Sequence, residues 1–148
     1  MIRLPDSVHD RLCRIAIGYQ DAEAERGIVV QRTGIESPRL VSDAVALTRA
    51  TRERDDVRQG SSVRGAIDLT VIAIQLAMMR DVVLPEEPAL TPPRDLPGDY
   101  TGVVLDALLV ALSGRIHVDE TLAATPEAVL REVWEDHFLL NPSAAKPG

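Results

Sequence analysis

Residues 60–80 read GSSVRGAIDLTVIAIQLAMMR, and this stretch decides the fold class. Gly60 and Ser61 interrupt the preceding segment, and Ser62 is a favoured N-cap residue because its hydroxyl can accept a hydrogen bond from a free backbone N–H. The residues that follow are apolar on almost every side, which is typical of a helix at the centre of a bundle. The stretch therefore predicts a helix to about Arg80 within a mainly α-helical domain.

Helix start and stop signals elsewhere predict four more helices around it. One begins at Asp21, where early carboxylates suit the helix dipole, and ends near Gly34. The others run from about Ser42 to Arg54, from Tyr100 to Ser113, and onward from Thr125, where Thr is the N-cap and Pro126 the first helical residue. One face of that last helix carries its large apolar side chains, which are Val129, Leu130, Val133, Trp134 and Phe138. Of these, we expect Trp134 to be largely buried.

Non-helical segments are predicted at four places. Residues 12–17 alternate apolar with small or charged residues and read as a short N-terminal strand. Residues 115–118 read as a short extended piece, and 81–98, which hold five prolines, as a stiff linker. Residues 141–148 are expected to be a frayed tail.

Composition limits the classes of protein that the chain can be. With 148 residues, 45% of them apolar, it has the size and content of one globular domain, and with 3% aromatic residues its core must be aliphatic. The single Cys13 excludes an internal disulfide, and His9, His117 and His137 have no metal-ligand spacing. The N-terminus has no apolar run typical of a signal peptide. We therefore expect a soluble, cytoplasmic protein that binds no metal by itself.

The charge is unevenly distributed along the chain. The net charge is −7, made up of about +1 over residues 1–64 and −8 over 65–148. The acidic half argues against sequence-independent binding of nucleic acid, which depends on neutralising phosphates. Any phosphate contact would fall to arginine, since Lys146 is the only lysine.

Known catalytic motifs are absent, so the candidate chemistry rests on arginine. There is no phosphate loop and no nucleophile elbow. Asp68 and Asp106 lie on otherwise apolar helices, where we expect each to be a buried partner of an arginine in preference to a catalytic acid. Arg64 falls in the first turn of a helix, where free N–H groups and the dipole attract anions. From spacing alone, Arg64 either meets such an anion or pairs with Asp68 one turn later.

Two boxes of sequence resemble the MoxR-type AAA+ ATPases, a group similar to the ATPase subunit of magnesium chelatase. Thr51-Arg52-Glu53 and Gly60-Ser61-Ser62-Val63-Arg64 match the family's TRE…GxSxRA pattern, although Gly65 precedes the expected alanine. Upstream, Leu4-Pro5-Asp6-Ser7 and Asp10-Arg11-Leu12 resemble its LPE…LDRF box, with Leu12 in place of Phe. Residues 15–19 resemble the end of the family's last core strand.

The resemblance implies a division of the chain and a role for each box. Residues 1–20 would be the remnant of an AAA+ core, with one strand, and 21–140 a helical-bundle lid. Arg64, with Ser62, would contact ATP as the sensor-2 residue, and Arg11, with Asp10, would act in trans as an arginine finger. The phosphate loop and Walker B acid would lie upstream of Met1, so ATP and Mg²⁺ would bind only in a complete module and this chain alone would hydrolyse no ATP.

The resemblance also implies partners, and two other functions remain open. Expected partners are the AAA+ catalytic half or neighbouring subunits of a ring, and a client with a von Willebrand factor A domain, with no nucleic acid and no membrane. The first alternative is a non-enzymatic helical adaptor that binds a protein through its acidic C-terminal half. The second, a DNA-binding module based on residues 1–64, is disfavoured by their near-neutral charge.

Overall fold

Helices make up most of the protein, as the sequence predicts. A computed structural model describes residues 19–86 and 96–140. Its elements, in chain order, are α2 (Ala22–Thr33), α3 (Pro38–Glu53), β1 (Val57–Gln59), α4 (Val63–Arg80), α5 (Gly98–Leu112), β2 (His117–Val118), α6 (Pro126–Glu135) and the π-helical turn η2 (Asp136–Leu140). The mainly α fold class is confirmed. The predicted N-terminal strand, the tail, residues 1–18 of the expected core remnant and residues 87–95 of the predicted linker lie outside the described residues.

The cap residues explain where these helices begin and end. The Asp21 side chain accepts a hydrogen bond from the N–H of Ala24, and Gly34 ends α2 with a φ of 67°, a left-handed conformation that glycine adopts without strain. The Thr125 side chain caps α6 in the same way as Asp21 caps α2. Helix α3 begins at Pro38, four residues before the predicted start, because proline suits the first turn.

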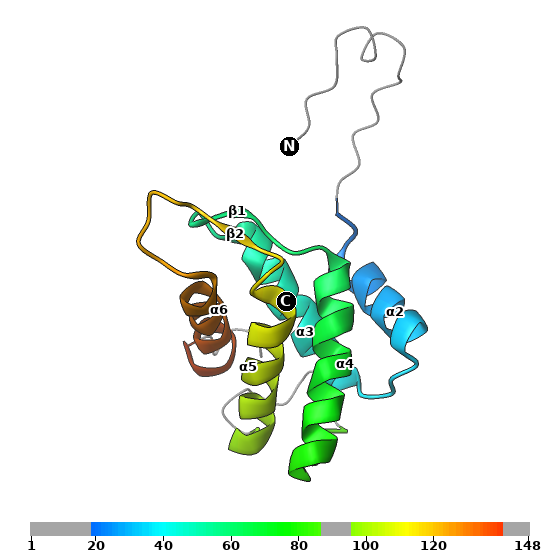
Figure 1. The fold of residues 1–148 in the computed structure, drawn as a ribbon. Coiled ribbons are helices and arrows are strands. Elements are labelled where there is room, and N and C mark those ends of the chain that lie inside the picture. Colours follow the sequence, from blue (N-terminus) through cyan, green and yellow to red (C-terminus); the bar gives the residue numbers. More distant parts are fainter. Residues whose placement is uncertain (1–18, 87–95, 141–148) are drawn as a thin grey trace, which may run out of the picture.

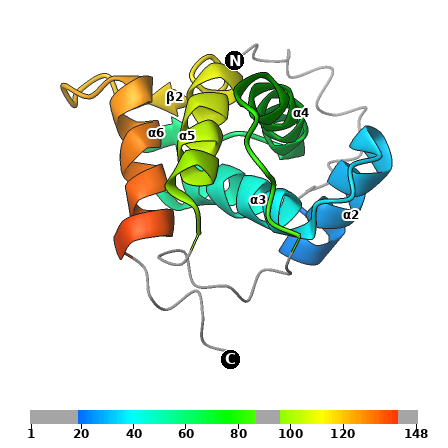
Figure 2. The ribbon, with the colours of Figure 1, turned by 90° about the horizontal axis from the view of Figure 1, so that it is seen from below.

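Helices α3 and α4 lie at the centre of the arrangement. Helix α4 contacts α2, α3 and α5. Helix α3 contacts α2, α4, α5 and α6. Figure 1 shows α4 and α5 side by side and running in opposite directions, so that α4 begins at the end of the molecule where α5 finishes. Figure 2 shows α3 passing beneath both helices, with α2 and α6 on opposite flanks.

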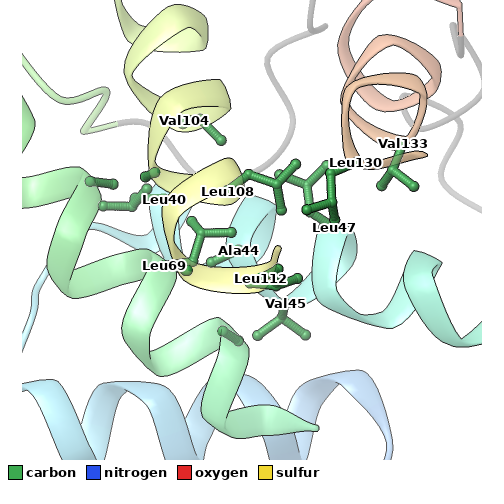
Figure 3. Packing of buried hydrophobic residues seen from close by; sticks show 14 of the residues in the cluster. Leu40, Ala44, Val45, Leu47, Leu69, Val104, Leu108, Leu112, Leu130 and Val133 are labelled. Atoms are coloured by element: carbon green, nitrogen blue, oxygen red, sulfur yellow. The ribbon is translucent and has the colours of Figure 1, made fainter. Parts of the chain in front are cut away.

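The core is aliphatic, as the shortage of aromatic residues requires. Figure 3 shows how α3, α4, α5 and α6 meet at fully buried leucines, which include Leu47, Leu69 and Leu108. Each buried leucine stabilises the fold by roughly 1.5–3 kcal/mol relative to an exposed one. Helix α3 contributes one buried face, made of Val41, Ala44, Val45 and Thr48.

A two-stranded sheet closes one end of the helical layer. Strands β1 and β2 are antiparallel, with Val57 opposite Val118 and Gln59 opposite His117. The sequence predicts the extended piece at residues 115–118 but not β1, because three residues between two helices show no alternation long enough to detect. The sheet fixes the loop that leads from α3 into α4.

Helix α4 is less enclosed than its sequence indicates. Its small residues Ala66, Ala73 and Ala77 are buried against its neighbours, but Met78 and Met79 are about four-fifths exposed. The helix contacts three others, as expected of a central helix, but one side of it faces solvent, where Val71 in the middle of the helix is also exposed. None of the described helices has the length and apolarity that a bilayer crossing requires.

Trp134 is half-buried, whereas the sequence predicts it to be largely buried. Its ring packs on Phe138, with centroids 5.8 Å apart, and its Nε1–H donates a 2.9 Å hydrogen bond to the carbonyl oxygen of Thr101. An indole N–H needs such an acceptor, and this one lies on α5 at the edge of the core. The Trp134 side chain therefore links α6 to α5 through this hydrogen bond at the edge of the core.

Candidate functional site

The two halves of the TRE…GxSxR pattern are in direct contact at the start of α4. The hydroxyl of Thr51, in the last turn of α3, accepts a 3.0 Å hydrogen bond from the N–H of Ser61. Arg52 donates through Nε to the carbonyl oxygen of Ser61 at 2.6 Å. A Cβ atom on Gly60 would lie only 2.7 Å from the Cα and N atoms of Arg52, so this close approach requires glycine. The pattern thus builds one rigid corner between α3 and α4.

Ser62 and Arg64 begin α4 at this corner. Ser62 is the N-cap, in an extended conformation, and its side chain accepts a 3.4 Å hydrogen bond from the N–H of Arg64. The Arg64 side chain is exposed. Among residues 19–86 and 96–140, no carboxylate forms an ion pair with its guanidinium. A solvent-facing guanidinium therefore stands beside the positive end of a helix dipole.

The carboxylate that could have engaged Arg64 has another partner. Asp68 pairs with Arg115, which follows α5, rather than with Arg64 on its own helix. Further along the same two helices, Asp106 pairs with Arg80 at 2.7 Å. Both aspartates are partners of arginine, as predicted, but neither pair is buried, because each lies along the open edge between α4 and α5 and is about half exposed.

A second group of charges, which the sequence does not reveal, shares Arg52 with the corner. Glu25, nearly buried on α2, pairs with Arg52 at 2.7 Å and with Arg49 at 3.4 Å. Arg49 also donates a 2.8 Å hydrogen bond to the carbonyl oxygen of Gln20. The guanidinium of Arg52 lies 4.0 Å from the ring centroid of Tyr19, within cation–π distance. These contacts fix the point where the chain enters α2.

A small cavity opens at the same corner. It has a volume of about 230 Å³ and is lined by side chains and backbone from three parts of the chain: Tyr19, Gln59, Gly60, Ser61, Ser62 and Arg115. The cavity brings together the residues before α2, the β1–α4 loop and the turn after α5. Apart from Tyr19, which covers Arg52, its lining is polar.

A larger hollow of about 760 Å³ lies along β2 and the loop that follows it. Two of its charged side chains are already engaged with each other, since Arg58 pairs with Asp119 at 3.4 Å. Hydrogen bonds from the backbone and side chain of Thr121 lower the pKa of Asp119, with a smaller contribution from Arg58. The arginine of this hollow is therefore already engaged by a carboxylate on the same wall.

A buried polar network joins α3, α5 and η2 away from the corner. Asp43, 3% exposed, accepts hydrogen bonds from Arg39 Nε at 2.8 Å and from the Tyr100 hydroxyl at 2.7 Å. The Nε2 atom of His137 lies 2.9 Å from its other oxygen. Burial, and then the charge of Asp43, raise the pKa of the Tyr100 phenol well above its usual range. Because every charged member is paired, we assign this network to structure.

The remaining predicted site residues can be placed only in part. Asp10 and Arg11, the expected arginine-finger pair, lie outside the described residues, as do His9 and Cys13. Ser62 and Arg64 are brought together. In the part of the chain that the structure describes, no three side chains of the metal-ligating types gather at one point.

Comparison with known proteins found no matching family model, no matching curated protein and no matching solved structure. What the chain and its structure define directly is a mainly α-helical domain with an arginine-rich corner.

Proposed function

We propose that the chain is the helical lid of a MoxR-type AAA+ ATPase and that it senses ATP through Arg64. In this function, Arg64 contacts the γ-phosphate of ATP bound by the catalytic half of the same module, and Ser62 holds the start of α4 against it. Arg11 contacts the nucleotide of a neighbouring subunit in a ring. Movement of the lid then couples the state of the nucleotide to ring assembly and to the maturation of a partner protein.

The observation that carries this proposal is that the Arg64 guanidinium forms no ion pair with any carboxylate of residues 19–86 and 96–140. It is exposed in the first turn of α4, and Asp68, the acid one turn further on, pairs with Arg115 instead. An arginine that merely supported the bundle would be expected to use its donors within the domain. A planar guanidinium beside free helix N–H groups suits a phosphate, which can take two parallel hydrogen bonds.

The division of labour with the catalytic half follows from phosphoryl-transfer chemistry. Mg²⁺ and a phosphate loop neutralise and position the transferred group, and the residues matched here supply neither. Arg64 would add positive charge to the terminal phosphate when the lid closes. We therefore expect ATP with Mg²⁺ as a cofactor only in the complete module. The purified chain alone should show no more than a weak contact between the ATP phosphates and Arg64, and it should turn no ATP over.

The adaptor alternative receives less support from the geometry. Two of the exposed acids on its expected surface, Glu132 and Asp136, already face Arg54 at 2.6 Å and 3.7 Å. The exposed apolar side chains Met78 and Met79 would suit a protein partner, but they lie at the opposite end of α4 from the corner. An adaptor of this kind would bind no nucleotide at Arg64.

An NMR titration of the full chain with ATP tests the proposal. The backbone amide signals of residues 62–65 should shift, and more with ATP than with ADP, because the terminal phosphate makes the contact. Arg64→Ala should abolish these shifts, and Arg64→Lys should reduce them strongly because an ammonium lacks the planar fork. The matched control is Arg131→Ala, which removes an exposed arginine of α6. Absence of any shift in the wild-type chain, or equal shifts in Arg64→Ala, would contradict the proposal.

A further inference from the structure

Arg115 occupies a position that the proposed function leaves unused. It lies in the turn between α5 and β2, where its N–H donates a 2.9 Å hydrogen bond to the carbonyl oxygen of Leu112. The next residue, Ile116, is buried in the core. The backbone of Arg115 is thus held firmly, while its side chain is 40% exposed and is held by the ion pair with Asp68.

The turn that carries Arg115 packs directly on the start of α4. A Cβ atom on Gly65 would lie 3.3 Å from the Cδ1 atom of Leu112, so the two helices touch at their shared end. Figure 1 shows this end, where α4 begins, α5 finishes and the two strands lie nearby. Arg115 therefore reaches the same corner as Arg64 from a different part of the chain.

From this placement we propose that Arg115 is a second phosphate-contacting arginine, and that Asp68 holds its side chain at the corner until a phosphate group displaces the carboxylate. This inference rests on the proposed function and names a further residue for the same site. Arg64 would contact the phosphate from the first turn of α4, and Arg115 from the wall of the neighbouring cavity.

The cavity fits one phosphate group better than a whole nucleotide. Its volume of about 230 Å³ is below the ~300–1,000 Å³ typical of pockets for drug-sized ligands. Its polar lining includes Arg115 and Ser62, whose hydroxyl accepts from the N–H of Arg64 and can still donate to a phosphate oxygen. The rest of a nucleotide would have to lie outside the cavity.

The surrounding charge favours an anion. The ion pairs that meet around the corner set three arginines (Arg49, Arg52 and Arg115) against the two carboxylates of Glu25 and Asp68, and Arg64 adds a fourth guanidinium. Arg52 lies against the cavity-lining residues Tyr19 and Ser61, and its buried Nη2 atom has no hydrogen-bond partner within the described residues. The buried Oε2 atom of its partner Glu25 also has no hydrogen bond within the described residues, so the net positive charge rests on the four guanidinium groups set against two carboxylates.

A phosphate can replace the Asp68 carboxylate as the partner of the Arg115 guanidinium, because each group offers two acceptor oxygens. The Arg115–Asp68 pair is open to water on both sides, 40% and 42% exposed, so solvent screens it and holds it weakly. A phosphate carries more charge than a carboxylate and can take the same two parallel hydrogen bonds. Asp68 then competes with the ligand, and its removal should strengthen binding.

The opposite end of the same helix pair provides a matched control. Arg80 and Asp106 also form an ion pair between α4 and α5, and each side chain is 46% exposed. Arg80→Ala and Asp106→Asn therefore make the same changes of charge and break a comparable ion pair, but far from the corner. Any effect that arises only from the net charge of the domain will appear in these variants as well.

The test is isothermal titration calorimetry of the full chain with ATP and, separately, with inorganic tripolyphosphate. We expect Arg115→Ala to weaken binding of both by roughly fivefold or more, because it removes a charge-assisted hydrogen bond to the ligand. Asp68→Asn should tighten both by about two- to fivefold, because it removes a competing charge. Arg80→Ala and Asp106→Asn should each change affinity by less than about 1.5-fold, since exposed charges beyond a Debye length are screened.

The outcomes separate this inference from the proposed function. If Arg64→Ala weakens ATP binding while Arg115→Ala behaves like Arg80→Ala, Arg115 has no phosphate role and the sensor function stands. If Arg115→Ala weakens binding and Arg64→Ala does not, Arg115 contacts phosphate and the sensor role of Arg64 is wrong. If the wild-type chain binds neither ligand, both are wrong. A loss of ATP binding in Arg115→Ala without any effect on tripolyphosphate would overturn the phosphate contact, and unchanged affinity in Asp68→Asn would overturn the exchange.

Discussion

At the scale of single residues, the exposure of an ion pair decides what it contributes. Asp43 and Asp106 each pair with an arginine, but Asp43 is buried with three partners and Asp106 is half exposed with one. Water compensates the loss of an exposed partner, whereas a buried charge left alone keeps its full desolvation cost.

Asp43→Ala should therefore destabilise the domain by about 3–5 kcal/mol, because Arg39 would lose its buried carboxylate. Asp106→Ala, the matched change in an exposed pair, should cost only ~0–1 kcal/mol. Urea unfolding followed by circular dichroism measures both values. Equal effects of the two substitutions would show that the network does not stabilise the fold.

Tyr100 makes stability depend on alkaline pH. Its pKa is raised in the folded protein by burial and by Asp43, while an unfolded tyrosine titrates near ~10. The contribution of Tyr100 is therefore complete below about pH 10 and is lost as the pH rises above that value, by up to ~1.4 kcal/mol per unit. Urea unfolding between about pH 9 and 11.5 should show this fall, and Tyr100→Phe should reduce it. The control Tyr19→Phe, at an exposed ring, should retain the fall, and an unchanged fall in Tyr100→Phe would refute the assignment.

The sequence can locate Arg64 but cannot show that, within the described part of the chain, its guanidinium has no carboxylate partner. Its place in the first turn of α4 follows from the Ser62 cap and is a local property. Whether Asp68 engages it depends on Arg115, 47 residues further along the chain, and such long-range partners leave no local pattern. The same reason hides the Glu25–Arg52 pair and the Asp43 network, whose members lie on different helices.

At the scale of elements, the β1–α4 loop is positioned by contact with the last turn of α3. Helix starts are predictable where a cap residue marks them, as at Asp21, Ser62 and Thr125. The burial of α4 is not predictable in this way, because an apolar sequence on all sides does not tell which side of a helix has neighbours. The exposure of Met78 and Met79 therefore leaves no signal in the sequence.

Gly60→Ala tests the contact between the loop and α3. The new Cβ atom would lie 2.7 Å from backbone atoms of Arg52, which cannot move without shifting α3, so we expect a loss of ~1–3 kcal/mol in stability. Gly27→Ala is the control, because a Cβ atom there meets nothing within 4 Å and the position is inside α2. That substitution should stabilise the protein by about 0.5–1 kcal/mol. Opposite signs in thermal unfolding support the account, and a neutral Gly60→Ala contradicts it.

At the scale of the whole molecule, charge is concentrated where three distant segments meet. The residues before α2, the β1–α4 loop and the turn after α5 share one end of the domain, while the exposed methionines lie at the other. The net charge of −7 therefore conceals a local excess of arginine. An anionic ligand would be attracted to that end despite the acidic whole.

The central claim is that the Arg64 guanidinium is kept free for a phosphate and does not support the fold. Urea unfolding of the wild-type chain and of Arg64→Ala, each with and without ATP, tests it most directly. Without ATP, the two proteins should agree within about 0.5 kcal/mol, as expected for an exposed site. With ATP in excess of its dissociation constant, only the wild-type chain should gain stability, since a ligand stabilises the state that binds it. A loss of more than about 2 kcal/mol in Arg64→Ala without ATP, or an equal gain in both proteins with ATP, would contradict the claim.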